Sequence, residues 1–179
     1  MNSKKIALVG PECSGKTTLA AALRQSYEGV LVTEYARTYF ENNPDNYTKE
    51  TVYHIATMQK KCMLAGVENA LITHKNYVFF DTSMLVITVW LEYKYNEKNT
   101  SYMQWEHDLD IQLYLLCSPD IDWQPDAQRE HPNERHLIFE CYKSLLDELQ
   151  LPYVIIKGAT QQRQLSAIES LNNLNFEIK

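Results

Sequence analysis

The stretch KKIALVGPECSGKT occupies residues 4–17 and determines the predicted fold. Its apolar part, residues 5–9, predicts a strand, and the pattern G-x-x-x-x-G-K-T follows directly at residues 10–17. Glycines let a backbone curl around a phosphate, so that successive N–H groups point at its oxygens. A helix over residues 17–27 would turn its positive end toward the same phosphates. We therefore predict a loop that binds the phosphates of ATP; a glycine turn without a ligand is the alternative.

Individual residues of this loop have predicted contacts. Lys16 would bring a mobile positive charge to the β- and γ-phosphates, and the Thr17 hydroxyl would bind Mg²⁺. ATP and Mg²⁺ are therefore the expected cofactors. The predicted ATP-binding residues of this segment are Gly10, Glu12, Cys13, Ser14, Gly15, Lys16, Thr17 and Thr18.

Short apolar runs alternate with helical patterns along all 179 residues. We expect strands at residues 5–9, 30–33, 77–81, 111–117 and 153–156. We expect helices at residues 17–27, 35–41, 48–73, from after 81 to about 95, 102–107, 134–149 and 160–174. This order predicts an α/β fold in which a five-stranded parallel sheet has helices on both faces. The length suits one P-loop domain over residues 1–179.

Asp81 ends the apolar strand at residues 77–81. Ligands of such sheets bind beyond the carboxyl ends of the strands, where a carboxylate can hold Mg²⁺ directly or through water. Asp81 is therefore a candidate metal ligand and catalytic residue. The alternative is that Asp81 caps the next helix, a role for which Thr82 and Ser83 compete.

Glu34, Tyr35 and Arg37 follow the second expected strand. The end of that strand lies near the phosphate loop in doubly wound sheets. Glu34 could accept the proton of a substrate hydroxyl, and Arg37 could bind a phosphate or orient that carboxylate. A surface ion pair at the start of a helix is the alternative.

The polar segment at residues 119–135 follows the fourth expected strand and carries Arg129 and Arg135. Phosphoryl transfer needs positive charge on the migrating group and exclusion of water, and a mobile lid could supply both. A solvated charged loop is the alternative.

Several aromatic residues could stack on a flat or cationic ring of a substrate, although most are expected to serve packing. They are Tyr35, Tyr39, Trp90, Tyr93, Tyr95, Trp105 and Trp123. The predicted substrate-binding residues are Glu34, Tyr35, Arg37, Trp90 and Trp123.

These pieces together resemble the nicotinamide riboside kinase domain of the NadR family and the related stand-alone bacterial AAA-domain ATPases. The matching pieces are residues 10–17, Glu34-Tyr35-Ala36-Arg37, Phe80-Asp81-Thr82, Trp123-Gln124-Pro125-Asp126 with Arg129, and the Gly158 loop with Arg163. They occur in order and span nearly the whole chain. Ser83 is a departure, because many members have a second acid there.

The resemblance implies a nucleoside-kinase-like fold and adds Gly158 to the expected ATP-binding residues. It implies transfer of the ATP γ-phosphate to the 5′-hydroxyl of nicotinamide riboside, which gives nicotinamide mononucleotide. Some members place a DNA-binding domain and an adenylyltransferase domain before the kinase. Because this chain begins at the kinase strand, we do not expect repression or adenylylation from it.

Two alternative functions remain open. One is a kinase of another nucleoside or small alcohol that uses the same machinery. The other is a regulatory P-loop ATPase without a small-molecule acceptor. A guanine-nucleotide switch is disfavoured because the Asn-Lys-x-Asp motif is missing, and a lid with two arginines favours a kinase.

Composition limits the expected partners and compartment. A net charge of -6 without a long basic run argues against a nucleic-acid partner. The four cysteines form no C-x-x-C pair, and no apolar run is long enough to span a bilayer. We expect a cytoplasmic protein with a small-molecule nucleoside substrate, reduced thiols, and no membrane partner. The sequence indicates no oligomeric state.

Overall fold

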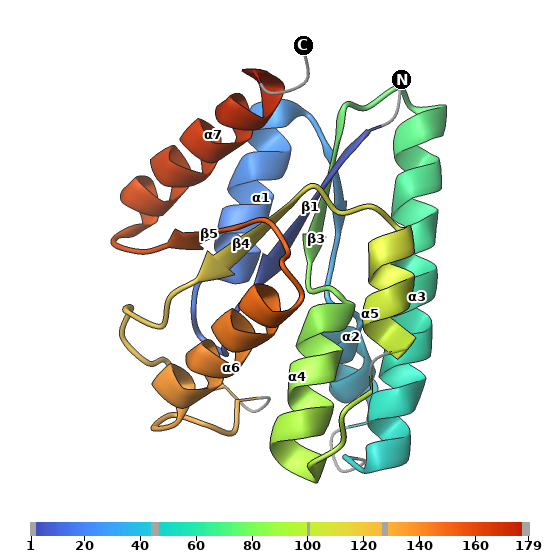
Figure 1. Cartoon of the computed structure of the whole chain (residues 1–179), viewed down its shortest axis with the longest axis vertical. Coiled ribbons are helices and arrows are strands. Elements are labelled where there is room, and N and C mark those ends of the chain that lie inside the picture. The colour runs from blue at the N-terminus through green and yellow to red at the C-terminus, as the bar shows by residue number, and fades with distance from the viewer. Residues whose placement is uncertain (1–2, 44–46, 100, 127–128, 177–179) are drawn as a thin grey trace.

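Five parallel strands form one sheet in the order β2-β3-β1-β4-β5 (Figure 1). The structure is a computed structural model that describes residues 3–43, 47–99, 101–126 and 129–176. The strands are β1 (Lys4–Val9), β2 (Val30–Val32), β3 (Tyr77–Asp81), β4 (Leu113–Cys117) and β5 (Tyr153–Ile156). The predicted five-stranded parallel sheet is therefore confirmed.

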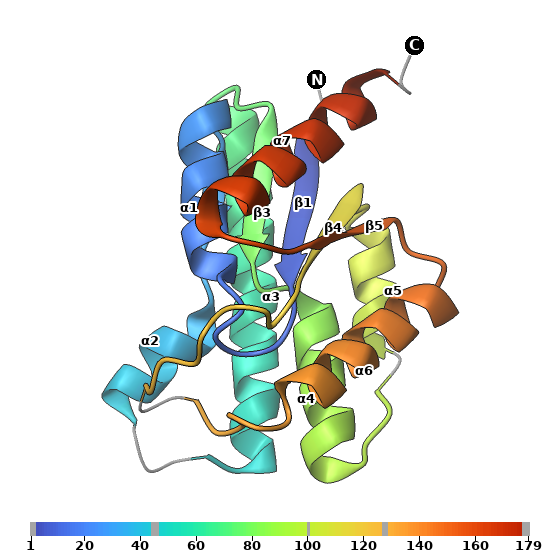
Figure 2. The ribbon, with the colours of Figure 1, turned by 90° about the vertical axis from the view of Figure 1, so that its left-hand side faces the viewer.

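Helices cover both faces of this sheet (Figures 1 and 2). The helices α1 (Lys16–Tyr27) and α7 (Thr160–Phe176) pack on one face. On the other face lie α3 (Lys49–Ile72), α4 (Met84–Tyr95), α5 (Ser101–Asp108) and α6 (Arg135–Glu148), and α2 (Tyr35–Asn42) packs against α3. No helix in the described ranges is long and apolar enough to cross a membrane.

Strand β1 shows why its last four residues, 6–9, are apolar without interruption. Ile6 and Leu8 belong to the hydrophobic cluster under α1 and α7, whereas Ala7 and Val9 belong to the cluster on the opposite face. Side chains alternate between the two faces of a strand, so a strand buried on both faces needs apolar residues at every position.

The expected boundaries agree with the structure to within two residues. The fourth strand begins at Leu113, not at residue 111. There the side-chain oxygen of Gln112 accepts a hydrogen bond from the Lys5 N–H at 2.6 Å, so a side chain takes the place of a backbone partner at the start of the strand. Thr48 precedes α3 as its N-cap and forms a capping box with Thr51.

The strand order brings the loop at residues 10–17 to the centre of the sheet edge. Strand β1 pairs with β3 on one side and with β4 on the other. Gly10 follows β1 with φ of 133°, and a Cβ atom there would lie 2.5 Å from the Cys117 carbonyl oxygen at the end of β4. Glycine is therefore required where the chain leaves β1. The loop opens at the carboxyl ends of the strands, where ligands of such sheets bind.

Candidate active site

The loop at residues 10–17 leaves the N-terminus of α1 open to a ligand. The backbone of Cys13 and Gly15 is left-handed, with φ of 50° and 79°. Gly15 is the N-cap of α1 and provides no side-chain cap, so the first N–H groups of that helix stay available to an anion. The buried Ser14 Oγ has no hydrogen-bond partner among the described residues. The Lys16 ammonium group donates to the Gly10 and Pro11 carbonyl oxygens, each at 2.9 Å.

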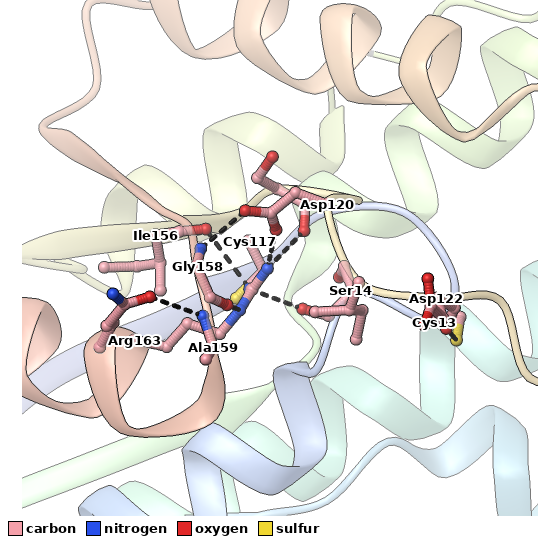
Figure 3. Close-up of polar contacts among 12 residues, drawn as sticks. Cys13, Ser14, Cys117, Asp120, Asp122, Ile156, Gly158, Ala159 and Arg163 are labelled. Carbon is pink, nitrogen blue, oxygen red and sulfur yellow. Dashed lines mark hydrogen bonds and ion pairs between the residues drawn. The ribbon is translucent and has the colours of Figure 1, made fainter.

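Arg163 of α7 bonds to the backbone of this loop at Ser14 (Figure 3). Its side chain is only 3% exposed. It donates to the Ser14 carbonyl oxygen at 2.9 Å, to the Ser118 carbonyl oxygen at 2.9 Å and to the Gly158 carbonyl oxygen at 2.7 Å. It also forms an ion pair with Asp120, whose second oxygen accepts from the Gly158 N–H at 2.6 Å. One guanidinium group thus joins the phosphate loop to the segments after β4 and β5.

Gly158 does not line the cavity at the phosphate loop. Its N–H donates a hydrogen bond to Asp120, and its carbonyl oxygen accepts one from Arg163. Its expected contact with ATP stays a prediction. Sequence reasoning missed Asp120, because a charged residue in a polar loop carries no signal of a partner 43 positions away.

Asp81 is buried at the end of β3, with 2% of its surface exposed. Its Oδ1 atom has no hydrogen-bond partner in the part of the chain that the structure describes. Ser83 is the N-cap of α4 and accepts from the Leu85 N–H, so the alternative that Asp81 caps this helix is wrong. Thr82 has φ of 111°, which is unusual for a residue with a branched side chain. The geometry leaves the Asp81 carboxylate available for a ligand.

Glu106 of α5 brings a second carboxyl group to this segment. It accepts hydrogen bonds from the Ser83 hydroxyl at 2.9 Å, the Tyr114 hydroxyl at 2.7 Å and the Leu85 N–H at 3.2 Å. Glu106 is fully buried, and the loss of solvation raises its pKa to about 7, although these hydrogen bonds oppose the shift. Sequence reasoning missed Glu106, because a single Glu in a short polar helix gives no sign of burial.

Glu34 lies at the end of β2 and precedes α2 as its N-cap. Its side chain makes no capping hydrogen bond. Glu34 is half-buried, and desolvation raises its carboxyl pKa, whereas the charge of Lys16 lowers it. A carboxylate with a raised pKa is a better proton acceptor when ionised.

A cavity of about 520 Å³ connects Glu34 with the phosphate loop. Its walls include all the loop residues predicted to bind ATP at residues 10 and 12–18. Its lining also includes the apolar and aromatic residues Phe40, Tyr47, Val52, Ile55, Val86, Ile87, Trp90, Ile138 and Tyr142. A cavity of this size can hold a nucleoside-sized ligand.

The predicted substrate-binding residues divide into two groups. Glu34, Arg37 and Trp90 line the cavity. Tyr35 and Trp123 do not: the Tyr35 ring lies 6.2 Å from the His54 ring, and Trp123 lies under two lid arginines. The cavity is also lined by Phe40, Tyr47 and Tyr142, which the sequence analysis did not name. An aromatic residue in a core and one in a cavity wall have the same sequence pattern.

The segment predicted to be a lid, residues 119–135, lies against the phosphate loop; Ala127 and Gln128 are outside the described residues. The Glu12 carboxylate accepts from the Glu130 N–H at 2.9 Å and from the His131 N–H at 3.3 Å. Burial raises the pKa of Glu12, and these two N–H groups oppose the shift. The Glu12 side chain therefore holds residues 130 and 131 of this segment, while the Glu12 backbone belongs to the loop.

Arg129 and Arg135, the two arginines of the predicted lid, make different contacts. Arg135 donates to the Cys13 carbonyl oxygen at 3.3 Å and to the Ile121 carbonyl oxygen at 3.0 Å, and it does not line the cavity. Arg129 does line the cavity, and its guanidinium group donates to the Gln124 carbonyl oxygen. Arg37 pairs with Asp126 of the same segment at 3.5 Å.

Comparison with known proteins identifies the family and the fold. The chain matches the family described as an AAA domain over residues 5–163. No match was found among curated protein sequences.

The solved structures with similar folds include two of NadR protein and one of a thymidylate kinase. The NadR protein in complex with NR has a TM-score of 0.75 at 21% identity, covering 96% of this chain and 50% of that one. The NadR protein in complex with NAD and AMP-PNP has a TM-score of 0.72 at 23% identity, covering 96% and 49%. Thymidylate kinase from Ehrlichia chaffeensis has a TM-score of 0.65 at 16% identity, covering 96% and 100%.

These similarities define the fold but not the substrate. The chain spans about half the length of the NadR chains that it matches. The predicted P-loop fold of the nucleoside- and nucleotide-kinase type is confirmed, and so is the resemblance to NadR at the level of fold. Because the family match covers 159 of 179 residues, the chain belongs to this family of AAA-domain P-loop proteins.

Proposed function

We propose that this protein transfers the γ-phosphate of ATP to the 5′-hydroxyl of nicotinamide riboside, which gives nicotinamide mononucleotide. One observation carries the proposal: Glu34 stands in the same cavity as the phosphate loop and the apolar wall around Trp90. In a kinase site the acceptor hydroxyl has to meet both the γ-phosphorus and a proton acceptor. The phosphate loop would hold ATP, and the apolar residues of the cavity would hold the nicotinamide ring of the acceptor.

Each predicted residue has a role in this proposal. Lys16 would leave the Gly10 and Pro11 carbonyl oxygens and neutralise the β- and γ-phosphates. The Ser14 hydroxyl and the first N–H groups of α1 would bind phosphate oxygens. Glu34 would accept the proton of the acceptor hydroxyl.

Mg²⁺ fits the chemistry of these residues. The Asp81 Oδ1 atom is buried without a partner among the described residues, and Thr17 is exposed at the start of α1. Mg²⁺ prefers oxygen ligands and takes the rest of its shell from water and phosphates. Asp81 and Thr17 would therefore hold the ion, which would supply charge neutralisation at the phosphates when bound.

The choice of nicotinamide riboside rests on the cavity and on the resemblance. Trp90 and Tyr47 line the cavity, and the Tyr47 ring already carries a cation, the Lys94 ammonium group, 3.4 Å from its centroid. Aromatic rings attract cationic groups in this way. Glu41 adds a carboxylate to the same wall. A positively charged pyridinium ring suits such a wall, and a solved NadR structure contains NR.

The test is an ADP-release assay with a panel of acceptors, confirmed by mass spectrometry of the product. Reduced nicotinamide riboside is the matched control, because it has nearly the same shape as nicotinamide riboside but no ring charge. We expect kcat/KM to be highest for nicotinamide riboside and lower for the reduced form and for adenosine, cytidine, uridine and thymidine. Equal values for the oxidised and reduced ribosides would remove the argument from ring charge.

Glu34→Gln tests the proposed proton acceptor. Glutamine keeps the shape but cannot take the proton, so transfer to the nucleoside should fall by about 10²-fold. Hydrolysis of ATP without an acceptor should change little. In the unaltered protein, kcat/KM should fall as the pH drops through the raised pKa of Glu34, because only the ionised form accepts a proton. Unchanged nucleoside phosphorylation in Glu34→Gln would refute this role.

A nucleoside monophosphate is the second candidate acceptor. Arg37 lines the cavity beside Glu34, and a guanidinium group binds phosphate well. Thymidylate kinase shares the fold over its whole length. Thymidylate and cytidylate therefore belong in the panel, and Arg37→Lys should raise KM for a monophosphate far more than for a nucleoside. If ATP is hydrolysed but no acceptor is phosphorylated, a regulatory ATPase becomes the better description.

A further inference from the structure

Gln59 lies between the two strand ends that carry Glu34 and Asp81. Its side-chain oxygen accepts a hydrogen bond from the Tyr35 N–H at 2.7 Å. Its side-chain nitrogen donates to the Thr82 carbonyl oxygen at 3.3 Å. One amide group therefore joins the residue after Glu34 to the residue after Asp81.

The amide of Gln59 is shielded from water and from the ligand cavity. Its residue surface is 1% exposed, and it does not line the cavity at the phosphate loop. A buried amide is stable only when its polar atoms are paired. Both ends of the Gln59 amide are used on backbone groups, which fixes the side chain in one orientation.

The helix that carries Gln59 is held at a fixed distance from the sheet. Gly66 lies seven residues later on the same face of α3. A Cβ atom at Gly66 would lie 2.2 Å from a methyl carbon of Val32 in β2, so α3 approaches the strand as closely as the backbone allows. Gln59 thus reaches the strand ends from a rigid support.

We propose that Gln59 is a positioning residue, which sets the separation between the Glu34 carboxyl group and the Asp81 carboxylate by holding both strand ends with one amide. The inference rests on the proposed function, because Glu34 and Asp81 act there on the acceptor and on the metal-bound phosphates. Thr82 has a left-handed backbone with φ of 111°, and its carbonyl group bonds to the Gln59 side chain. Loss of that bond would let the segment after Asp81 relax.

Gln59→Met separates this role from simple packing. Methionine has a similar length but leaves the Tyr35 N–H and the Thr82 carbonyl group unpaired. A small displacement of reacting groups costs up to about 10²-fold in rate, so we expect kcat to fall about 10- to 100-fold. KM for ATP should change less than about 3-fold, since the phosphate loop keeps its contacts.

Met63→Ala is the matched control for lost stability. Met63 is fully buried on the same helix, one turn beyond Gln59. Its truncation leaves a cavity and lowers Tm but removes no polar contact to the strand ends. We expect its kcat to stay within about 2-fold of the unaltered protein.

Gln59→Glu provides rescue by a conservative change. A protonated glutamic acid can accept from the Tyr35 N–H and donate to the Thr82 carbonyl group, whereas the ionised form cannot donate. Burial favours the neutral form of a carboxyl group. The ratio of kcat for Gln59→Glu to kcat for the unaltered protein should therefore rise as the pH falls from 8 to 6. The same ratio for Gln59→Met should stay constant.

Measuring the affinity for ATP with and without Mg²⁺ tests this inference independently of the proposed function. If the unaltered protein phosphorylates no acceptor, the proposed function fails, but the gain in ATP affinity from Mg²⁺ still reports on Asp81. That gain should shrink by up to about 3-fold in Gln59→Met, within the small change expected for KM, and persist in Met63→Ala. The inference is overturned if Gln59→Met and Met63→Ala have the same kcat and the same gain in ATP affinity from Mg²⁺. If no acceptor is phosphorylated, an equal gain in the two variants is enough to overturn it.

Discussion

Replacing Glu106 by glutamine should stabilise the protein at pH 8 and change its stability little at pH 5. In the folded state the carboxyl group is fully buried and its pKa is raised from 4.5 to about 7. The folded protein therefore holds a proton that the unfolded chain loses near pH 4.5. Stability from this group is complete below pH 4.5 and is lost as the pH rises through about 7.

The pKa values give the size of the effect. One pKa unit corresponds to about 1.4 kcal/mol, so the group loses about 3 kcal/mol of unfolding free energy between these pH values. A typical domain has a free energy of unfolding of about 5–15 kcal/mol, so this loss is a large part of it. Glutamine can accept from the Leu85 N–H and donate to the hydroxyls of Ser83 and Tyr114, because hydroxyl groups can reverse their roles.

Urea unfolding at pH 5 and pH 8, followed by circular dichroism, measures this difference. The change in unfolding free energy caused by Glu106→Gln should be about 2.5 kcal/mol more favourable at pH 8 than at pH 5, because part of the stabilisation is already lost at pH 5. Comparing the two pH values cancels any effect of the amide that does not depend on pH. Glu140→Gln is the control, since Glu140 is exposed on α6. An identical pH dependence in Glu106→Gln and in the unaltered protein would contradict the reasoning.

Three further predictions concern the proposed phosphoryl transfer. Lys16→Ala should lower kcat by about 10²-fold or more in a folded protein, and near-normal turnover would exclude its assigned role. Asp81→Asn should abolish most of the Mg²⁺-dependent activity while sparing nucleotide affinity measured without metal; a loss of Tm with activity retained would point to a structural role. Arg129→Ala should lower kcat, because Arg129 lines the cavity, whereas Arg135→Ala should chiefly raise KM for ATP, because Arg135 bonds to the loop carbonyl of Cys13. Steady-state kinetics of the two single variants checks this division, and equal effects would contradict it.

Local sequence signals determined the sheet and the phosphate loop. The glycines, Lys16 and Thr17 form a pattern within eight residues, and each strand is a short apolar run. Such signals depend on neighbours in the chain, so they survive without knowledge of the packing. The same reasoning located Glu34 and Asp81 at strand ends, because parallel strands end at one edge of the sheet.

Only the tertiary structure decided which side chains support the site and which aromatic residues face the cavity. Arg163 bonds to the Ser14 carbonyl group across 149 positions, and Gln59 reaches Thr82 across 23. Trp123 matched the family pattern but lies against lid arginines outside the cavity wall. These contacts depend on how the helices pack on the sheet. The spacing of residues along the chain does not show which residues this packing brings together. A buried Gln, Glu or Arg looks like a surface residue until the fold removes the water around it.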